Sequence, residues 1–211
     1  MTAAPRIAVL DYGIGNLRSA EKALQHVGAA ARLVDDPADV AGADAVVLPG
    51  VGAFGACARA LHDSGLEDPA RSAIASGVPF FGVCVGFQLL YDGSVESPGA
   101  TGLGVFPGQV GALPSGVKHP QMQWNVLEVC GTGAGEPAPL HGLGPHPWVY
   151  FVHSFAPPVG AETVAVCDYG GEVAALAIRG SLWGAQFHPE KSGATGLALL
   201  ANFVRAAKAA A

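Results

Sequence analysis

Strand-like and helix-like patterns alternate along the first half of the chain, and this alternation constrains the fold more than any other feature. Short apolar runs typical of buried strands occupy residues 6–13, 31–34, 44–50 and 79–83. Segments with helical spacing lie between them, at residues 16–28, 53–62 and 68–76. Strands that alternate with helices predict a parallel sheet covered on both faces.

The pattern changes after residue 103. Strand-like runs separated by Gly and Pro follow at residues 108–113, 124–129, 148–155, 162–169, 172–178 and 182–187. They predict antiparallel additions to the sheet, with a long loop at residues 131–147 and a last helix at about residues 195–208. We therefore expect an α/β three-layer sandwich. Its central sheet is mostly parallel and is extended by antiparallel strands in the second half, within a single domain over residues 1–211.

Composition argues against several classes of protein. Half of the 211 residues are hydrophobic and 13% are charged, which indicates a compact globular domain. The net charge is −6 and Lys and Arg form no cluster, which argues against a nucleic-acid-binding protein. The four cysteines lack the spacing of a metal site or a disulfide framework, as suits a reducing cytosol. Without a membrane-length apolar run or a signal-peptide core, we expect a soluble, cytoplasmic protein.

The cysteine in "GVCVGFQLL" lies where the strand at residues 79–83 meets an expected helix at residues 85–91. Free cysteine is usually an inert buried group, so Cys84 alone predicts no chemistry. At a strand-to-helix turn, however, the close approach of strand and helix needs small residues, which accounts for Gly82 and Gly86. The turn also directs the sulfur to a helix N-terminus, which favours the thiolate. G-x-C-x-G is thus the cysteine counterpart of the hydrolase nucleophile elbow, and it requires a base.

His188 is the best candidate for that base among the seven histidines. It follows an apolar run that ends at Phe187, and the proline after it stops the strand. The side chain therefore projects from the carboxyl end of a strand, where open α/β sheets build their sites. Glu190 can orient the imidazole and stabilise its charged form. For His153, in "YFVHSF", both a structural and a functional role stay open.

Residues 50–55 match G-x-G-x-x-G, the fingerprint of dinucleotide-binding sites. The match follows the third expected strand instead of the first, and no acidic residue closes a following strand in the expected place. We therefore favour a different role, in which these glycines let backbone N–H groups turn toward a developing oxyanion. No cofactor is expected.

Together, "GVCVGFQLL" and "QFHPEKSG" resemble motifs of the class I glutamine amidotransferases. "DYGIGNLRSAEKAL", "LPGVGAF" and "YFVHSF" are similar to the glutaminase subunits of imidazole glycerol phosphate synthase within that family, and the resemblance spans almost the whole chain. It implies a glutaminase whose catalytic triad is Cys84, His188 and Glu190. The other residues that it assigns are Val51, Gly52 and Val85 for the oxyanion hole, Gln88, Glu96 and Ser154 for glutamine, and Asn16, Trp124 and Lys191 for a partner interface.

The resemblance also implies a partner, a (β/α)8 synthase subunit that forms a heterodimer with this chain. Ammonia would reach it through a channel and serve to make imidazole glycerol phosphate and an aminoimidazole carboxamide ribotide in histidine biosynthesis. Neither a metal nor a cofactor is implied for this subunit.

Three residues depart from the pattern of these subunits. Gln121 and Gln123 stand where a histidine and a glycine are common, which bears on the partner-facing surface, and Phe87 replaces the usual methionine. Three alternative functions remain open. They are another glutaminase of the same class, such as one feeding pyridoxal phosphate synthesis; a cysteine peptidase or stress-related thiol protein on a similar fold; and a non-catalytic binding module.

Overall fold

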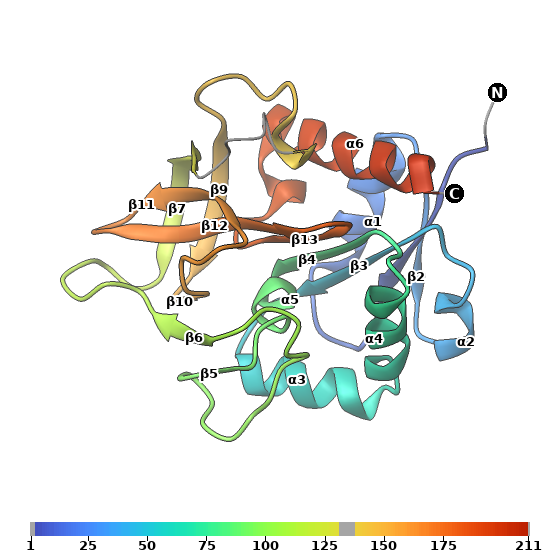
Figure 1. The fold of residues 1–211 in the computed structure, drawn as a ribbon, viewed down its shortest axis with the longest axis horizontal. Coiled ribbons are helices and arrows are strands. Elements are labelled where there is room, and N and C mark those ends of the chain that lie inside the picture. The colour runs from blue at the N-terminus through green and yellow to red at the C-terminus, as the bar shows by residue number, and fades with distance from the viewer. Residues whose placement is uncertain (1–2, 131–137, 211) are drawn as a thin grey trace.

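The computed structural model describes residues 3–130 and 138–210, and an eight-stranded sheet forms its centre (Figure 1). In spatial order, the strands are β2 (Ala30–Val34), β1 (Arg6–Leu10), β3 (Ala45–Gly50), β4 (Phe80–Cys84), β13 (Leu182–Ala185), β12 (Glu172–Arg179), β11 (Thr163–Asp168) and β8 (Glu128–Val129). The first five run parallel to one another, and the last three continue the sheet in antiparallel fashion. The expected α/β sheet is therefore confirmed.

The direction of β13 differs from the prediction. Its run was expected to be an antiparallel addition, but β13 pairs parallel with β4, with Ala185 opposite Val83. A tight connection at Gly180 and Ser181 reverses the chain after β12, so β13 must run opposite to β12 and therefore along β4. This places the carboxyl ends of β4 and β13 at the same edge of the sheet.

Helices cover both faces of the sheet. They are α1 (Leu17–His26), α2 (Pro37–Val40), α3 (Phe54–Asp63), α4 (Glu67–Ala75), α5 (Val85–Gln88) and α6 (Gly193–Ala210), with short 3₁₀ turns at Ala138–Leu140 (η1) and Pro189–Lys191 (η2). In Figure 1, α1 and α6 lie on one side of the sheet, and α3 and α4 lie on the other. The three layers confirm the expected sandwich.

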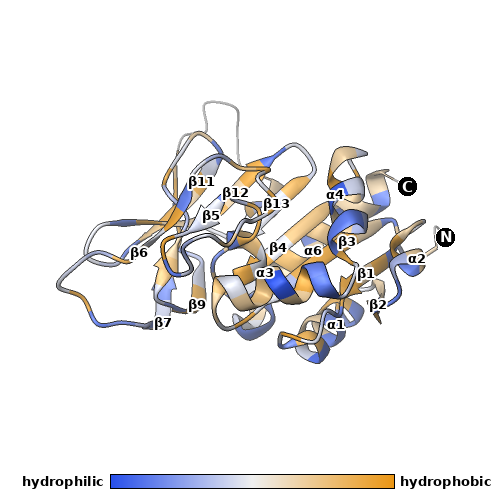
Figure 2. Ribbon diagram, turned by 90° about the horizontal axis from the view of Figure 1, so that it is seen from below, coloured by the Kyte–Doolittle hydropathy of each residue, from blue (hydrophilic) through white to orange (hydrophobic). Residues whose placement is uncertain are grey.

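The core holds β13 firmly in the middle of the sheet. The rings of Phe81 on β4, Trp183 on β13 and Phe203 on α6 lie in mutual contact, with centroids 5.3–6.2 Å apart. All three are at least 98% buried. Figure 2 shows the same pattern over the whole fold, since the central strands are mostly hydrophobic and hydrophilic residues gather on the helices and loops around them.

Part of the second half departs from the prediction. Several strand-like runs do not join the central sheet. One small sheet contains β10 (Phe155–Ala156), β6 (Gln109–Ala112) and β5 (Gly93–Ser94), and another contains β7 (Gln121–Val126) and β9 (Trp148–His153). Strand β7 pairs along its whole length with β9, from Gln121 opposite His153 to Val126 opposite Trp148. Of the expected loop at 131–147, residues 131–137 lie outside the described residues.

Candidate active site

Cys84 sits on a strained elbow. It ends β4, Val85 begins α5, and Cys84 is the one non-glycine residue with positive φ (55°) in the described parts of the chain. The flanking glycines are required sterically, because a Cβ on Gly86 would lie 1.8 Å from the Leu48 carbonyl oxygen and one on Gly82 would lie 2.7 Å from the Gly86 oxygen. The predicted nucleophile-elbow geometry is present.

The helix after Cys84 is shorter than predicted. Instead of residues 85–91, α5 covers only Val85–Gln88, because the N–H groups of Leu90 and Tyr91 donate to the carbonyls three residues earlier instead of the helical partners four residues earlier. A single turn carries little macrodipole. The stabilisation of a Cys84 thiolate must therefore come mainly from side chains.

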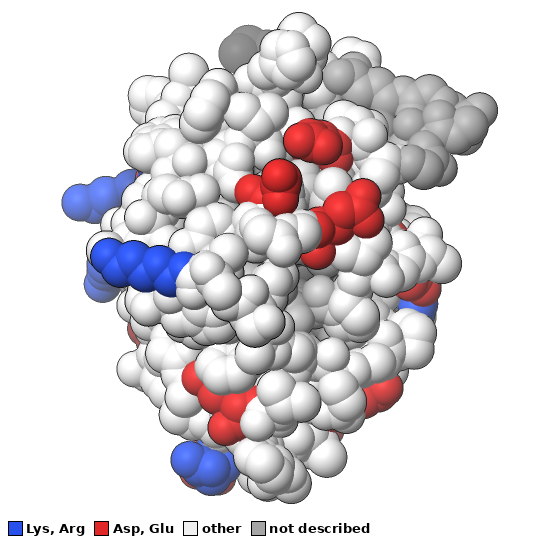
Figure 3. All heavy atoms as spheres, turned by 90° about the vertical axis from the view of Figure 1, so that its left-hand side faces the viewer, with Lys and Arg blue, Asp and Glu red and all other residues white. Residues whose placement is uncertain are grey.

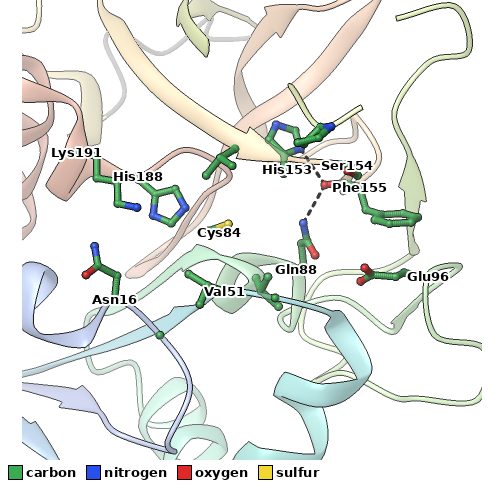
Figure 4. Close-up of a pocket in the computed structure, with 15 residues that line it drawn as sticks. Asn16, Val51, Cys84, Gln88, Glu96, His153, Ser154, Phe155, His188 and Lys191 are labelled. Atoms are coloured by element: carbon green, nitrogen blue, oxygen red, sulfur yellow. Dashed lines mark hydrogen bonds between the residues drawn. The ribbon is translucent and has the colours of Figure 1, made fainter. Parts of the chain in front are cut away.

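His188 and Glu190 reach the same edge of the sheet from β13. The Nδ1 of His188 lies 2.8 Å from Glu190 Oε1, and the two side chains are 2% and 5% exposed. The backbone that carries them is fixed, since the His188 N–H donates to the Tyr150 carbonyl and Ser192 Oγ donates to the His188 carbonyl. Figure 4 shows the imidazole directed toward Cys84.

Burial alone would lower the pKa of His188. Interactions with Cys84 and Glu190 outweigh this effect and raise the pKa to about 10, so the imidazolium is the favoured form at neutral pH. Its Nε2 is buried and makes no hydrogen bond of standard geometry with any described residue. Catalytic hydrogen bonds are often long before the substrate binds, so this geometry is compatible with a base at His188.

Cys84 and His188 border a cavity of about 630 Å³. Most of the residues that the sequence assigned to the site also line it, namely Val51, Gly52, Val85, Gln88, Glu96, Ser154, Asn16 and Lys191. Glu190 lies behind His188, and Trp124 lies outside the cavity. The structure therefore brings together ten of the twelve assigned residues around one cavity, and places Glu190 in contact with it through His188.

Two polar side chains define the end of the cavity away from His188 (Figure 4). Gln88 donates from Nε2 to the Phe155 carbonyl, 2.9 Å away. Glu96 accepts from the backbone N–H of Phe54, the first residue of α3, at 2.8 Å. That bond uses one carboxylate oxygen, and the carboxylate places a negative charge in the cavity wall, suited to a ligand ammonium group.

Side chains hold the carbonyl groups of the segment that precedes α3. The Tyr12 hydroxyl donates to the Pro49 carbonyl at 2.6 Å, and the Cys57 thiol donates to the Val51 carbonyl at 3.2 Å. Because a trans peptide is planar, the N–H of Gly52 points away from the Val51 carbonyl and therefore away from Cys57. Gly52 has a φ of 95° and no other atom near its Cβ position, so the orientation of this peptide depends on these hydrogen bonds.

The remaining predicted positions lie around the mouth of the cavity or beyond it. Asn16 is the residue before α1, and Trp124 is 45% exposed on β7. Gln121 corrects an expectation, because it is fully buried beside Cys167 and cannot belong to a partner-facing surface. Gln121 and Gln123 share one face of β7, since side chains alternate along a strand, and on that face Gln121 is buried while Gln123 is exposed.

Sequence reasoning missed Gln186. This residue is fully buried, and its Nε2 lies 3.8 Å from Cys84 Sγ. The position directly after a strand and two residues before His188 was a usable signal, but the surrounding apolar run concealed it. His153, for which both roles stayed open, lines the cavity. Within the described residues, no group of three His, Cys, Asp or Glu side chains is placed to hold a metal ion.

Comparisons with known proteins agree with this geometry. The family model "Glutamine amidotransferase class-I" matches residues 8–207. The imidazole glycerol phosphate synthase subunit HisH of Deinococcus radiodurans is 49% identical over 96% of this chain and 94% of its own, and the HisH subunit of Salinibacter ruber is 45% identical over 92% of each. No described helix is long and apolar enough to cross a membrane.

Solved structures show the same fold. A crystal structure of glutamine amidotransferase has a TM-score of 0.74 at 24% identity, over 95% of this chain and 98% of its own. The structure of PurLQS from Thermotoga maritima has a TM-score of 0.73 at 20% identity, over 96% and 98%. The chain belongs to the class-I glutamine amidotransferase family and, within it, to the HisH subunits of imidazole glycerol phosphate synthase.

Proposed function

We propose that this chain hydrolyses L-glutamine to glutamate and ammonia, with Cys84 as the nucleophile. The observation that carries the proposal is the position of Cys84, on a strained elbow beside the buried His188–Glu190 pair and at the wall of a 630 Å³ cavity. A nucleophile at a cavity wall, an adjacent base and a carboxylate that orients the base form the arrangement that acyl-transfer enzymes share.

The cavity suits an amino acid with a terminal amide. The Glu96 carboxylate binds the α-ammonium group, while Gln88 and the backbone around Ser154 hold the rest of the α-carbon substituents. These groups lie at the opposite end of the cavity from His188 (Figure 4), so the side-chain carboxamide of a bound glutamine reaches Cys84. The cavity thus selects a substrate by its length, with the α-ammonium group at one end and the carboxamide at the other.

The chemistry then follows in two halves. In the reactive form the proton of Cys84 resides on His188, as the favoured imidazolium, and the thiolate attacks the carboxamide carbon. The imidazolium gives its proton to the departing nitrogen, the C–N bond breaks, and ammonia leaves a glutamyl thioester. Water that loses its proton to His188 attacks the thioester carbon, which releases glutamate and restores the Cys84 sulfur. Backbone N–H groups of Val85 and of the Val51–Gly52 segment stabilise the tetrahedral oxyanion of each half.

The names of the relatives lead us to propose a synthase partner that uses the ammonia. Residues facing outward on β7 and β9 form a mainly apolar ribbon, namely Met122, Trp124, Val126, Trp148, Tyr150 and Val152. Met122, Trp124 and Trp148 are 45–61% exposed, and Val152 also lines the cavity. An exposed apolar surface that continues into the active site suits a protein partner through which ammonia can pass without meeting solvent.

Several further expectations belong to the same proposal. The partner is a (β/α)8 synthase in a heterodimer, the products are imidazole glycerol phosphate and aminoimidazole carboxamide ribotide, and the site of action is the cytoplasm. Lys191 and Asn16, at the cavity, contribute to the contact. The chain acts as one domain, since β13 near its C-terminus joins the sheet begun by β1.

On the face in Figure 3, acidic side chains gather near the top and basic ones are few.

A glutaminase assay with and without the cognate synthase subunit tests the proposal. Glutamate release that depends on the synthase supports it. A glutaminase of another pathway would ignore the synthase, a cysteine peptidase would cleave peptides instead of glutamine, and a binding module would do neither. Either of the last two results would overturn the proposal, whereas glutaminase activity that ignores the synthase would overturn only the synthase partner proposed above.

Glu96→Gln is expected to weaken glutamine binding. The amide keeps an acceptor for the Phe54 N–H but loses the charge that meets the α-ammonium. KM for glutamine should rise by about tenfold to a hundredfold, since hydrogen bonds to charged groups are the strong ones, with a much smaller change in kcat. Steady-state kinetics of the complex measure both. An unchanged KM would remove Glu96 from the substrate site.

Glu190→Gln is expected to slow turnover less than loss of the nucleophile does. The carboxylate sits 2.8 Å from His188 Nδ1 and stabilises the imidazolium, but it forms no bond with substrate. A reduction in kcat of about a hundredfold is expected for a group that orients the base. Comparison of kcat in Glu190→Gln and Cys84→Ala complexes checks this, and equally inactive variants would show that Glu190 does more than orient.

A further inference from the structure

We propose that Gln186 is a further catalytic residue of this site, whose side-chain amide donates to the reacting sulfur of Cys84 while its carbonyl oxygen holds Gln88 in place. The inference rests on the proposed glutaminase function and assigns a role within the same site.

The fold places Gln186 beside the sulfur. Ala185, the last residue of β13, pairs with Val83. The residues that follow them, Gln186 and Cys84, therefore also lie side by side. The Gln186 backbone N–H donates to the Ala175 carbonyl on β12 at 2.9 Å, which fixes the main chain. The side chain is fully buried, so its amide cannot exchange these partners for water.

The orientation of the two amides is determined by a backbone group. The Phe155 carbonyl can only accept, so the atom of Gln88 that lies 2.9 Å from it must be the NH₂ group. The same nitrogen lies 3.0 Å from Gln186, whose nearer atom must therefore be the carbonyl oxygen. The NH₂ group of Gln186 is then the one that faces Cys84 Sγ, at 3.8 Å.

His153 completes this chain of hydrogen bonds. Its Nδ1 lies 2.9 Å from the same Phe155 carbonyl and must carry a proton to bond with it. Burial lowers the pKa of His153 to about 4, so the ring is neutral and its Nε2 has no proton at neutral pH. The Phe155 carbonyl thus receives two donors and cannot accept from Gln186.

Gln186 thus contacts both Gln88, in the proposed glutamine site, and Cys84, the proposed nucleophile. A buried amide dipole aimed at sulfur stabilises negative charge there and needs no reorganisation when the charge forms. It also compensates for the single-turn α5, whose dipole is small. The titratable groups near Cys84 are His188, Cys57 and Tyr12; the Gln186 amide differs from them because its contribution does not change with pH.

Two substitutions test the proposal on the full chain. Gln186→Met keeps the length of the side chain without a donor, and Gln186→Glu keeps the shape but opposes a thiolate. The readout is the pH profile of Cys84 alkylation by iodoacetamide, followed on the Cys84 peptide by mass spectrometry. Burial raises the pKa of Cys57 and Cys167 to about 11, so both remain unreactive thiols near neutral pH.

Gln186→Met should slow alkylation at neutral pH by about tenfold, the effect of one hydrogen bond to a charged group, and should shift the profile to higher pH. Gln186→Glu should slow it further. In the complex, kcat for glutamine should fall and KM should rise, because Gln88 loses a partner. Asn202→Asp is the matched control, since it also replaces a buried side-chain amide with an acid. Asn202 lies on α6, where its amide donates to the carbonyls of residues 139 and 141. Its alkylation profile should match the parent protein.

A parent-like alkylation profile in Gln186→Met would overturn the proposal. If a variant fails to fold, the NMR resonance of the Gln186 side-chain amide in the parent protein provides the test. It should shift when Cys84 is alkylated, and an unchanged resonance would show that the two groups do not interact. Alkylation needs no glutamine, so a chain that turned out to lack glutaminase activity would still answer this question.

Discussion

Cys84→Ala should abolish glutamine-dependent product formation while the complex with the synthase continues to use free ammonium salts. The nucleophile is needed only to release nitrogen from glutamine, and ammonia supplied directly enters the reaction after that step. Glutamate release and synthase product formation are measured with glutamine and, separately, with ammonium salts. His188→Asn should give the same pattern, because the nucleophile is then without its base.

Cys167→Ala provides the matched control for this experiment. Cys167 is also fully buried, on β11 and outside the cavity, so its loss tests the general cost of removing a core thiol. The assignment of Cys84 would be wrong if the Cys84→Ala complex kept a tenth of the glutaminase rate, a loss of only about 1.4 kcal/mol of transition-state stabilisation. Loss of the ammonium-dependent reaction would instead indicate a damaged complex.

The isolated chain should hydrolyse glutamine very slowly, and synthase carrying its nucleotide ligand should accelerate it by about a hundredfold or more, as expected when one oxyanion donor is supplied. We attribute the expected slow resting state to the segment that precedes α3. Hydrogen bonds from Tyr12 and Cys57 hold the Pro49 and Val51 carbonyls, so the Val51–Gly52 peptide must break the Cys57 bond before it can turn. Gly52 has open space at its Cβ position and no side chain that would resist such a turn.

Turnover is compared for the chain alone, with ligand-free synthase and with liganded synthase. Trp124→Ala, which removes an exposed ring from the apolar ribbon, should lower the stimulation ratio, and Lys191 and Asn16 should carry part of the same coupling. Equal rates under all three conditions would refute control by the partner while leaving the assignment of Cys84 intact.

Local patterns predicted the parts of the fold that depend on neighbouring residues. Apart from the short α2, the strands and helices up to β4 follow from periodicity, and the glycines around Cys84 follow from the close approach of Gly86 to Leu48. His188 and Glu190 could be paired because a single residue separates them. In each case the physical cause lies within a few residues of its effect.

The failures involve partners that are distant in sequence. A strand-like run does not say which strand it will join, so β7 and β9 were expected in the central sheet, and β13 was expected to be antiparallel. The helix at 85–91 was too long, since Leu90 and Tyr91 close tighter turns and the Leu89 and Leu90 carbonyls then accept from Leu103 and Phe106, which are distant in sequence. Gln186 was missed for the same reason, since its partners Gln88 and Cys84 belong to another part of the chain.

The pairing of β13 with β4 also sets the order of events when this protein is made. Cys84 and Gln186 are 102 residues apart in sequence, and His188 follows still later. During synthesis the proposed nucleophile emerges long before its proposed base, and the central strand of the sheet is among the last to be added. Such long-range contacts form slowly. A nascent or truncated chain therefore carries an unactivated thiol and consumes no glutamine, and the onset of glutaminase activity in a refolding experiment reports the insertion of β13.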